Sequence, residues 1–255
     1  MIRRIREHAV KQNWFAVAVD FAIVVLGVFL GIQVNNWNQT RVDRNNGTEY
    51  RERLSDELRT TETAMRGLEA YADTAKKSGA AALTVLNNAS APAGGIFLFN
   101  AYQASQIVPR GGRHATYDEI IQAGALDHVG PPALRDKISN FYWRMDGLLS
   151  LDAGSSTYRE KLRTTMPNLV QEAILAKCSE QLADAGNGLI IASLPERCDP
   201  QIDATLVSQV ASRLRAEPGL ADALNRQLSA LDGRSLSYAK LAAHARDLRL
   251  AIEHY

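Results

Sequence analysis

The feature that most constrains this chain is an apolar stretch over residues 14–34. Asp20 is its only ionisable residue, and the twelve residues that follow Asp20 are all apolar or Gly. At about 1.5 Å of rise per residue, a helix of this length spans roughly 31 Å, close to the hydrocarbon thickness of a bilayer. Trp14 and Trp37 flank the stretch, where the aromatic residues of a membrane belt belong. The sequence therefore predicts one transmembrane helix, which we place at residues 14–36.

Two other interpretations of this stretch fit it less well. A cleaved signal peptide has a shorter apolar part and ends in small residues at its cleavage site. This stretch instead runs into Gln-Val-Asn-Asn-Trp-Asn at residues 33–38. A helix of a soluble domain normally keeps a polar face, whereas this one is apolar on every side. We therefore expect an anchor that stays attached to the chain.

The orientation of the anchor follows from its flanks. Four basic residues precede the span and four follow it within residues 41–53, so the positive-inside count is close to a tie. The leading ones sit in a short tail, residues 1–13, which is easily held in the cytoplasm. A cysteine pair in the rest of the chain suits an oxidising compartment. We predict a cytoplasmic N-terminus and a periplasmic bulk.

Residues 37–90 are expected to continue from the span as a long stalk helix. Over residues 54–86, apolar or small side chains recur at alternating spacings of four and three, which is a heptad pattern. Ala and Gly dominate the second half of this seam, so it requires a partner helix at close range. Residues 238–255 have similar spacing and are the natural antiparallel partner. The Pro- and Gly-rich residues after Asn87 are expected to end the helix.

Residues 91–255 predict a periplasmic α-helical domain that packs on the stalk helix. Helical stretches are expected at 97–107, 116–124, 132–145, 155–185 (a helix pair or one kinked helix), 200–216, 218–231 and 234–254. The run GNGLIIASLP is β-like but too short and isolated to build a sheet. The predicted fold class is all-α: a single N-terminal transmembrane helix, a long stalk helix and a periplasmic helical bundle.

Within this domain, local patterns predict a helix start and a surface. Thr116 and Glu119 have the spacing of a capping box, in which the Thr hydroxyl accepts from the Glu amide and the Glu carboxylate reaches back. Three consecutive aromatic residues at 141–143 must be divided between the faces of a helix. We expect the first two in the core and Trp143 exposed, as a candidate partner surface.

Three residues of the span are candidates for an interface within the membrane. Gly27 and Gly31 form a Gly-x-x-x-Gly step that lets two helices touch, although such pairs also arise by chance. Asp20 is costly inside a bilayer unless it is paired, protonated or hydrated. It is either a functional carboxylate or one that lies near the cytoplasmic interface, beside Lys11 or lipid headgroups.

The two cysteines, Cys178 and Cys198, are expected to form a disulfide that closes a loop of about 20 residues. The alternative is two buried thiols in a reducing compartment. Neither cysteine has the neighbours of a metal site.

No catalytic, cofactor-binding or metal-binding constellation stands out. The five histidines lack metal spacing and stand outside any nucleophile motif. His114, in a Gly-Gly-Arg-His loop, is the one whose setting comes nearest to a catalytic position. A net charge of +1 gives no reason to expect nucleic acid. We therefore expect a protein that is not an enzyme and that has no cofactor.

Two blocks of sequence resemble a known family. Asp20, an aliphatic run and Gly-x-x-x-Gly-Ile-Gln-Val-Asn-Asn-Trp-Asn at residues 27–38 resemble the N-terminal signature of a family of uncharacterised bacterial single-pass membrane proteins. Residues 115–148 resemble that family's Thr-Tyr-x-Glu-Leu…Gly…Leu-Arg…Tyr-Tyr segment. The resemblance implies a bacterial inner-membrane location, and the family has no assigned activity to carry over.

These features favour a membrane-anchored helical protein that mediates protein–protein association. Its expected partners are the lipid bilayer and either further copies of itself or another membrane protein. The alternative is a periplasmic ligand-binding or sensing module. Sensor domains normally return through a second membrane helix, which this sequence does not contain, so we expect sensing to need a partner.

Overall fold

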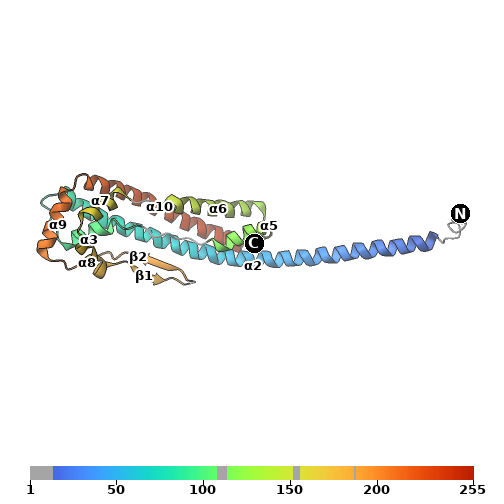
Figure 1. Ribbon diagram of the computed structural model, residues 1–255. Helices are drawn as coiled ribbons and strands as arrows, with labels where there is room; N and C mark the ends of the chain where they lie inside the picture. Colours follow the sequence, from blue (N-terminus) through green and yellow to red (C-terminus); the bar gives the residue numbers. More distant parts are fainter. Residues whose placement is uncertain (1–13, 108–113, 152–155, 187) are drawn as a thin grey trace, which may run out of the picture. The chain divides into compact units, whose positions relative to one another are not determined.

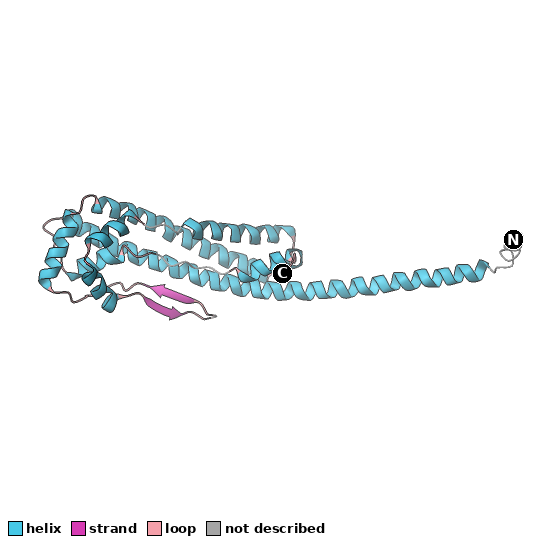
Figure 2. Ribbon diagram, in the orientation of Figure 1, coloured by secondary structure: helices cyan, strands magenta, loops and turns pink. Residues whose placement is uncertain are grey.

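The computed structural model describes residues 14–107, 114–151, 156–186 and 188–255, and the predicted cytoplasmic tail (1–13) lies outside them. The chain is mostly helical (Figure 2). Its contacts divide it into two compact units, Met1–Tyr50 and Arg51–Tyr255. Helix α2 (Trp14–Asn87) contributes residues to both and ends where the Pro- and Gly-rich segment begins, as the sequence predicts.

The first unit contains the apolar part of α2. An 18-residue window of this part has a mean hydropathy of 2.4, and none of the window is buried. Its large apolar side chains are exposed all around the helix, from Phe21 to Trp37. By length and composition, this is the one helix among the described residues that can cross a membrane. A helix without a polar face has no preferred side to bury against one protein neighbour.

The second unit is built around the pairing of α2 with α10 (Leu220–Glu253). The hydroxyl of Ser55 donates to Glu253 Oε1 over 2.8 Å, and that of Ser235 donates to Asp73 Oδ1 over 2.7 Å. Because residue numbers rise along α2 while they fall along α10, the two helices are antiparallel (Figure 1). The predicted partner of the heptad seam is therefore correct.

The seam itself is buried within this unit. Gly79 shows how close the partners come: a Cβ atom there would lie 2.7 Å from Leu228 Cδ2 and 3.1 Å from Ala104 Cβ. The other buried members of the seam are Leu54, Leu58, Thr61, Met65, Leu68, Ala72, Ala75 and Ala82. The close partner that the small residues require is thus supplied by the same chain.

Helix α10 corrects one expectation from the sequence. Two helices were expected, at 218–231 and 234–254, but α10 is continuous across Gly233. A Gly inside a helix costs only about 1 kcal/mol. Contacts with α2 hold the residues on either side of Gly233 in the helix, since Asp232 pairs with Lys76 and Ser235 donates a hydrogen bond to Asp73.

The remaining helices fill the unit around α2 and α10. They are α3 (Gly95–Gln103), α4 (Ala115–Gln122), α5 (Leu126–Val129), α6 (Pro132–Leu151), α7 (Thr157–Thr165), α8 (Asn168–Cys178) and α9 (Ala204–Ala216). Helices α7 and α8 form the expected helix pair, separated at Pro167. Buried side chains of α3, α7, α8 and α9 form one core cluster with the start of α10.

A β-hairpin is the second correction. Strands β1 (Gln181–Asp184) and β2 (Ile190–Ser193) pair antiparallel (Figure 2), although the sequence predicted helix at β1 and no sheet at β2. Two features explain a hairpin this short. Gly186 and Gly188 adopt positive φ in its turn. Ile191 packs on α2 where Gly67 leaves room, since a Cβ there would lie 2.7 Å from Ile191 Cγ2.

Candidate functional site

Helix α6 divides its three consecutive aromatic residues between two faces. Phe141 and Tyr142 are 5% and 1% exposed, whereas Trp143 is 74% exposed. The sequence predicts this division, because Ile138 and Met145 place the buried face one turn to either side. Trp143 therefore presents a large aromatic surface from a helix that is fixed on its other side.

A groove lies between α6, the helix that carries Trp143, and α10. It has a volume of about 450 Å³ and is lined by Lys137, Asn140, Phe141, Arg144, His244, Asp247, Leu248 and Ala251. Phe141 and Leu248 are buried and form an apolar floor, and the charged residues form the rims. Trp143 is not part of this lining, but it follows Asn140 of one rim by three residues, about one turn of α6. We call this surface the α6–α10 groove.

The charges of the α6–α10 groove are mostly positive. Lys137 and Arg144 are seven residues apart, about two helical turns, so they share one side of α6. Among the described residues, neither Lys137 nor Arg144 has an ion-pair partner. His244 contributes an imidazole ring from α10, on the other side of the groove. The one carboxylate of the lining, Asp247, lies 3.5 Å from Arg246. The groove thus has uncommitted cations above an apolar floor, which suits an anionic partner.

A buried carboxylate of α2 holds α6 in place. The Tyr142 hydroxyl donates to Glu57 Oε1 over 2.7 Å. The Tyr142 ring stacks on Tyr117 of α4 with centroids 4.1 Å apart, and Phe141 meets it edge-on. Burial, and next the negative charge of Glu57, raise the pKa of the Tyr142 hydroxyl well above its usual range. The floor of the groove is therefore tied to α2 by a neutral tyrosine.

The same carboxylate corrects the expected capping box. Glu57 Oε2 accepts from the backbone N–H of Thr116 over 2.7 Å, so a residue of α2 satisfies the start of α4. The N-cap position belongs to His114, and Glu119 pairs with Arg53 of α2 instead of reaching back. The hydrogen bond from Arg53 lowers the pKa of Glu119. The expected box is thus wrong, because α2 brings a charged acceptor to the amides that the box was to satisfy.

His114, the histidine nearest to a catalytic setting, has a structural explanation. Its Nδ1 lies 2.7 Å from Asp118 Oδ2, four residues later in the first turn of α4. At the other end, the helix stops at Gln122 with Ala123 as its C-cap, and the next residue, Gly124, has φ +63, the left-handed conformation in which many helices end.

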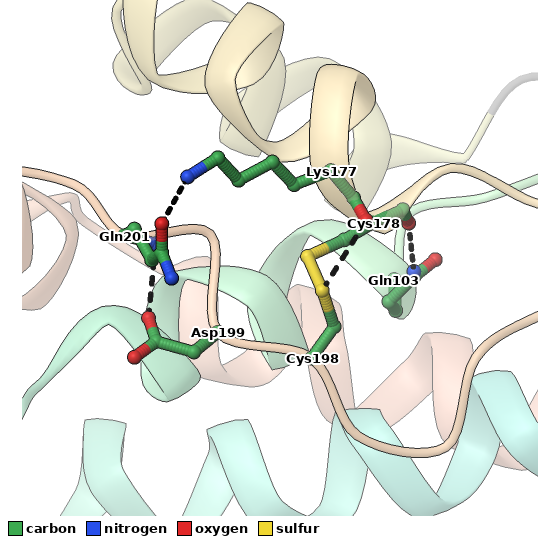
Figure 3. Close-up of a disulfide and its surroundings, with 6 residues drawn as sticks. All are labelled: Gln103, Lys177, Cys178, Cys198, Asp199 and Gln201. Atoms are coloured by element: carbon green, nitrogen blue, oxygen red, sulfur yellow. Dashed lines mark hydrogen bonds between the residues drawn. A yellow bond between two sulfur atoms is a disulfide. The ribbon is translucent and has the colours of Figure 1, made fainter.

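A disulfide joins Cys178, the last residue of α8, to Cys198, which precedes α9 (Figure 3). The carbonyl of Cys178 accepts from Gln103 Nε2 over 3.1 Å, and Cys198 Sγ lies 3.6 Å from the carbonyl oxygen of Lys177. The sequence separation of 20 residues encloses the whole β-hairpin. The disulfide therefore fixes both ends of the hairpin segment to the helical core.

The residues predicted to act in the membrane belong to the first unit, away from the α6–α10 groove in sequence. Asp20 is exposed on α2, and Trp37 is 68% exposed. Among the described residues, and leaving aside the adjacent residues and the nearby backbone of α2 itself, no atom lies within 4 Å of a Cβ built on Gly27 or Gly31. Trp14 begins α2, and its side chain lies outside the described residues. Their roles as a helix interface and a membrane belt stay predictions.

Two parts of the site were missed in the sequence. The groove had a local signal, since Lys137 and Arg144 share one helical side, but its second rim comes from α10, about a hundred residues later. The role of Glu57 had no local signal in the sequence, because the backbone N–H groups that it accepts from lie 59 and 60 residues further along the chain.

Comparison with known proteins identifies no relative of this chain. A scan against protein-family models, a search of curated proteins and a search of solved structures found no match to this chain. In the part of the chain that the structure describes, no group of three His, Cys, Asp or Glu side chains is placed to hold a metal ion. The α6–α10 groove with Trp143 is therefore the candidate functional site.

Proposed function

We propose that this chain is a non-enzymatic, single-pass membrane protein whose helical unit, residues 51–255, binds another protein at the α6–α10 groove. Trp143 is the observation that carries the proposal. It is a 74% exposed tryptophan one helical turn from Asn140 of a groove that has an apolar floor and, among the described residues, two cations without ion-pair partners, and such a composition is typical of a binding hot spot. The Tyr142–Glu57 bond holds the helix that presents it, so little ordering is needed on binding.

Site-specific crosslinking tests this function. A photoreactive amino acid at position 143, in the full chain expressed in its own membrane, should give one discrete protein adduct that mass spectrometry identifies. Leu236 is a matched control, because it is a large apolar residue of α10 that is 56% exposed and does not line the groove. Equal adduct patterns at 143 and 236 would contradict a specific partner at the groove.

The membrane arrangement is part of the proposal. The apolar part of α2 would span a bacterial inner membrane, with residues 1–13 in the cytoplasm and the helical unit, as a bundle, in the periplasm. The hydropathy of α2 supports a span, and the disulfide suits an oxidising compartment. Cysteine labelling at residues 5 and 100 checks the orientation. Labelling of residue 5 from outside intact spheroplasts would overturn it.

Self-association is a narrower form of the proposal. The small-residue seam of α2 is contacted at Gly79 by α10 and Ala104, so this seam gives no reason to expect a second copy. Gly27 and Gly31 still offer an open surface for helix contact, and Asp20 would be less costly in such an interface. Native mass spectrometry in mild detergent should show a dimer or larger species. A monomer alone would leave a different protein as the partner.

One observation favours the alternative function, a ligand-binding module. The side chains of Lys137, Arg144 and His244 surround one groove, and such convergence is typical of a small-molecule site. The crosslinking experiment separates the two functions, since a small ligand would give no protein adduct at position 143.

A further inference from the structure

A second groove, separate from the first, runs along α2 beside α3. It consists of two cavities of about 470 and about 430 Å³. Ala81, Ile96 and Asn100 line both cavities, so the two adjoin. We call the pair the α2–α3 groove.

One end of the α2–α3 groove carries polar groups without partners. Ser78 is only 4% exposed, and among the described residues its hydroxyl has no hydrogen-bond partner. Thr74 and Thr84 of the same helix donate to the carbonyl four residues earlier, as helical hydroxyls usually do. The Asn100 side-chain amide also lacks a partner in the described part of the chain. The Ser78 hydroxyl is not among the fully buried unpaired groups, so it is accessible from the cavity, where a polar group of a ligand can form a hydrogen bond with it.

The charge at this end is positive on balance. Within the described residues, the Arg197 guanidinium has no hydrogen-bond or ion-pair partner. Lys77 Nζ lies 3.9 Å from Glu196 Oε1, and both side chains are more than 70% exposed, which makes this a weak pair. Two cations thus face one carboxylate, so the end suits a single negative charge.

The other end is mainly apolar. Val85, Pro92 and Phe97 line the second cavity, together with the backbone of Gly94 and Gly95. Its polar side chains are Asn100, shared with the first cavity, and Asp199, which accepts a hydrogen bond from the backbone N–H of Gln201 (Figure 3). Ile96, at the junction of the cavities, is 61% exposed and so offers an apolar surface to a bound molecule.

The walls are fixed. The lining residues of α2 from Thr74 to Val85 share one helical face, over about 16 Å. Cys198 of the disulfide lines the facing wall, and Lys177 bonds Gln201 to hold the same loop (Figure 3). The groove is thus an elongated and rigid site, polar and positive at one end and apolar at the other.

We propose that the α2–α3 groove binds an anionic amphiphile, with a carboxylate or phosphate head group and a linear apolar tail. Lys77 and Arg197 face the head group, and Ser78 and Asn100 hydrogen-bond it. The tail lies along Ala81 and Ile96 into the second cavity. The two grooves share no lining residue, so this proposal does not depend on partner binding at the α6–α10 groove.

Photo-crosslinking in lipid nanodiscs tests the site on the full chain. The probes are decanoic acid and decyl phosphate that carry a diazirine in the tail, with mass spectrometry to locate the adducts. At least one anionic probe should label the peptides that contain Ala81 and Ile96. Labels confined to residues 17–42 would overturn the proposal, because the probes would then reside only around the apolar helix.

Two variants of α2 separate filling the groove from changing the helix. Ala81→Trp places a large side chain inside the groove and should lower the adduct yield at least tenfold. Ala80→Trp is the matched control, since Ala80 is an exposed neighbour that does not line the groove, and its yield should equal that of the native chain. Circular dichroism of both variants checks that each is folded. Equal yields for the two folded variants would contradict the proposal.

The head group has its own test. Arg197→Glu should weaken labelling by the anionic probes about tenfold, the effect of losing one charge-assisted contact. A diazirine decanol should label the native chain weakly and be unaffected by the same substitution. Labelling by decanol as strong as by both anionic probes, with no effect of Arg197→Glu, would show that no anion is recognised.

Discussion

Residues 17–34 and 54–86 belong to the same helix, α2, yet they meet their surroundings in opposite ways. The first segment is apolar on all sides, and its 18-residue window is entirely exposed. The second has one apolar or small stripe, and nearly all of that stripe is buried. The difference shows that the arrangement of apolar residues, more than their number, decides whether a helix faces protein on one side or an apolar medium on all sides.

Glycines make the same comparison at single residues. Gly79 touches Leu228 and Ala104, so its missing side chain lets α10 and the end of α3 approach α2. In the described part of the chain, the Cβ position of Gly31 has no atom within 4 Å other than those of adjacent residues and the nearby backbone of α2. A small residue in the second segment is therefore explained within the chain, whereas one in the first segment is free to contact something outside it.

Removing a large side chain from each segment should give the largest difference in stability between the two segments. Leu58→Ala deletes a fully buried side chain and should lower the free energy of unfolding of residues 51–255 by about 4 kcal/mol. Leu30→Ala, at a position 60% exposed, should leave that free energy unchanged. Urea unfolding monitored by circular dichroism measures both. Equal losses would mean that both segments are packed against protein.

The disulfide should give the next largest effect. Replacing Cys178 and Cys198 by Ala opens the loop between them, whose ends are 20 residues apart in sequence. The free energy of unfolding should fall by about 3 kcal/mol, because the unfolded chain is then less constrained. The loss should be confined to the second unit, leaving the membrane fraction of the chain unchanged. Mass spectrometry of non-reduced peptides provides the control. If it finds both thiols free in the native chain, the disulfide and the periplasmic location both lose support.

Filling a glycine in each segment should have a smaller effect. Gly79→Leu forces α10 and Ala104 away and should cost about 2 kcal/mol of stability through overpacking. Gly31→Leu meets no neighbour in the described part of the chain, so the free energy of unfolding should stay unchanged while any association within the membrane weakens. Thermal unfolding and native mass spectrometry distinguish the two outcomes. A loss of stability in Gly31→Leu would contradict the account of that segment.

Acid pH should give the smallest effect, again in the second unit only. Hydrogen bonds from Arg53 and from Ser55 hold the pKa values of Glu119 and Glu253 below their usual 4.5. A lowered pKa contributes stability above the unfolded value, and that contribution is lost as the pH falls through the folded value. Stability should thus decline below about pH 4.5, less steeply in Glu119→Gln. Glu52→Gln, at an exposed position, should follow the native curve.

Local patterns predicted much of the fold because each has a short-range cause. The Pro- and Gly-rich segment after Asn87 ends α2, the heptad of α10 matches that of α2, and the spacing on α6 exposes Trp143. Contacts far apart in sequence account for the errors. Glu57 replaces the capping box because folding brings it to Thr116, and Gly67 of α2 provides the seat for a hairpin that looked too short to form. Of the candidate site, only Trp143 was predictable, since α10 supplies half the groove.

Spin-label scanning tests the two-environment account of α2 most directly. The described chain has no free cysteine, so single cysteines can be placed at consecutive positions 22–33 and 58–69 of the protein in nanodiscs. With one chain in each nanodisc, so that helices of two copies cannot meet, accessibility to oxygen over 22–33 should be high at every position with no helical period. Over 58–69, it should oscillate with a period of about 3.6 residues, with minima at Leu58, Met65 and Leu68. A helical period over 22–33, or none over 58–69, would contradict the account.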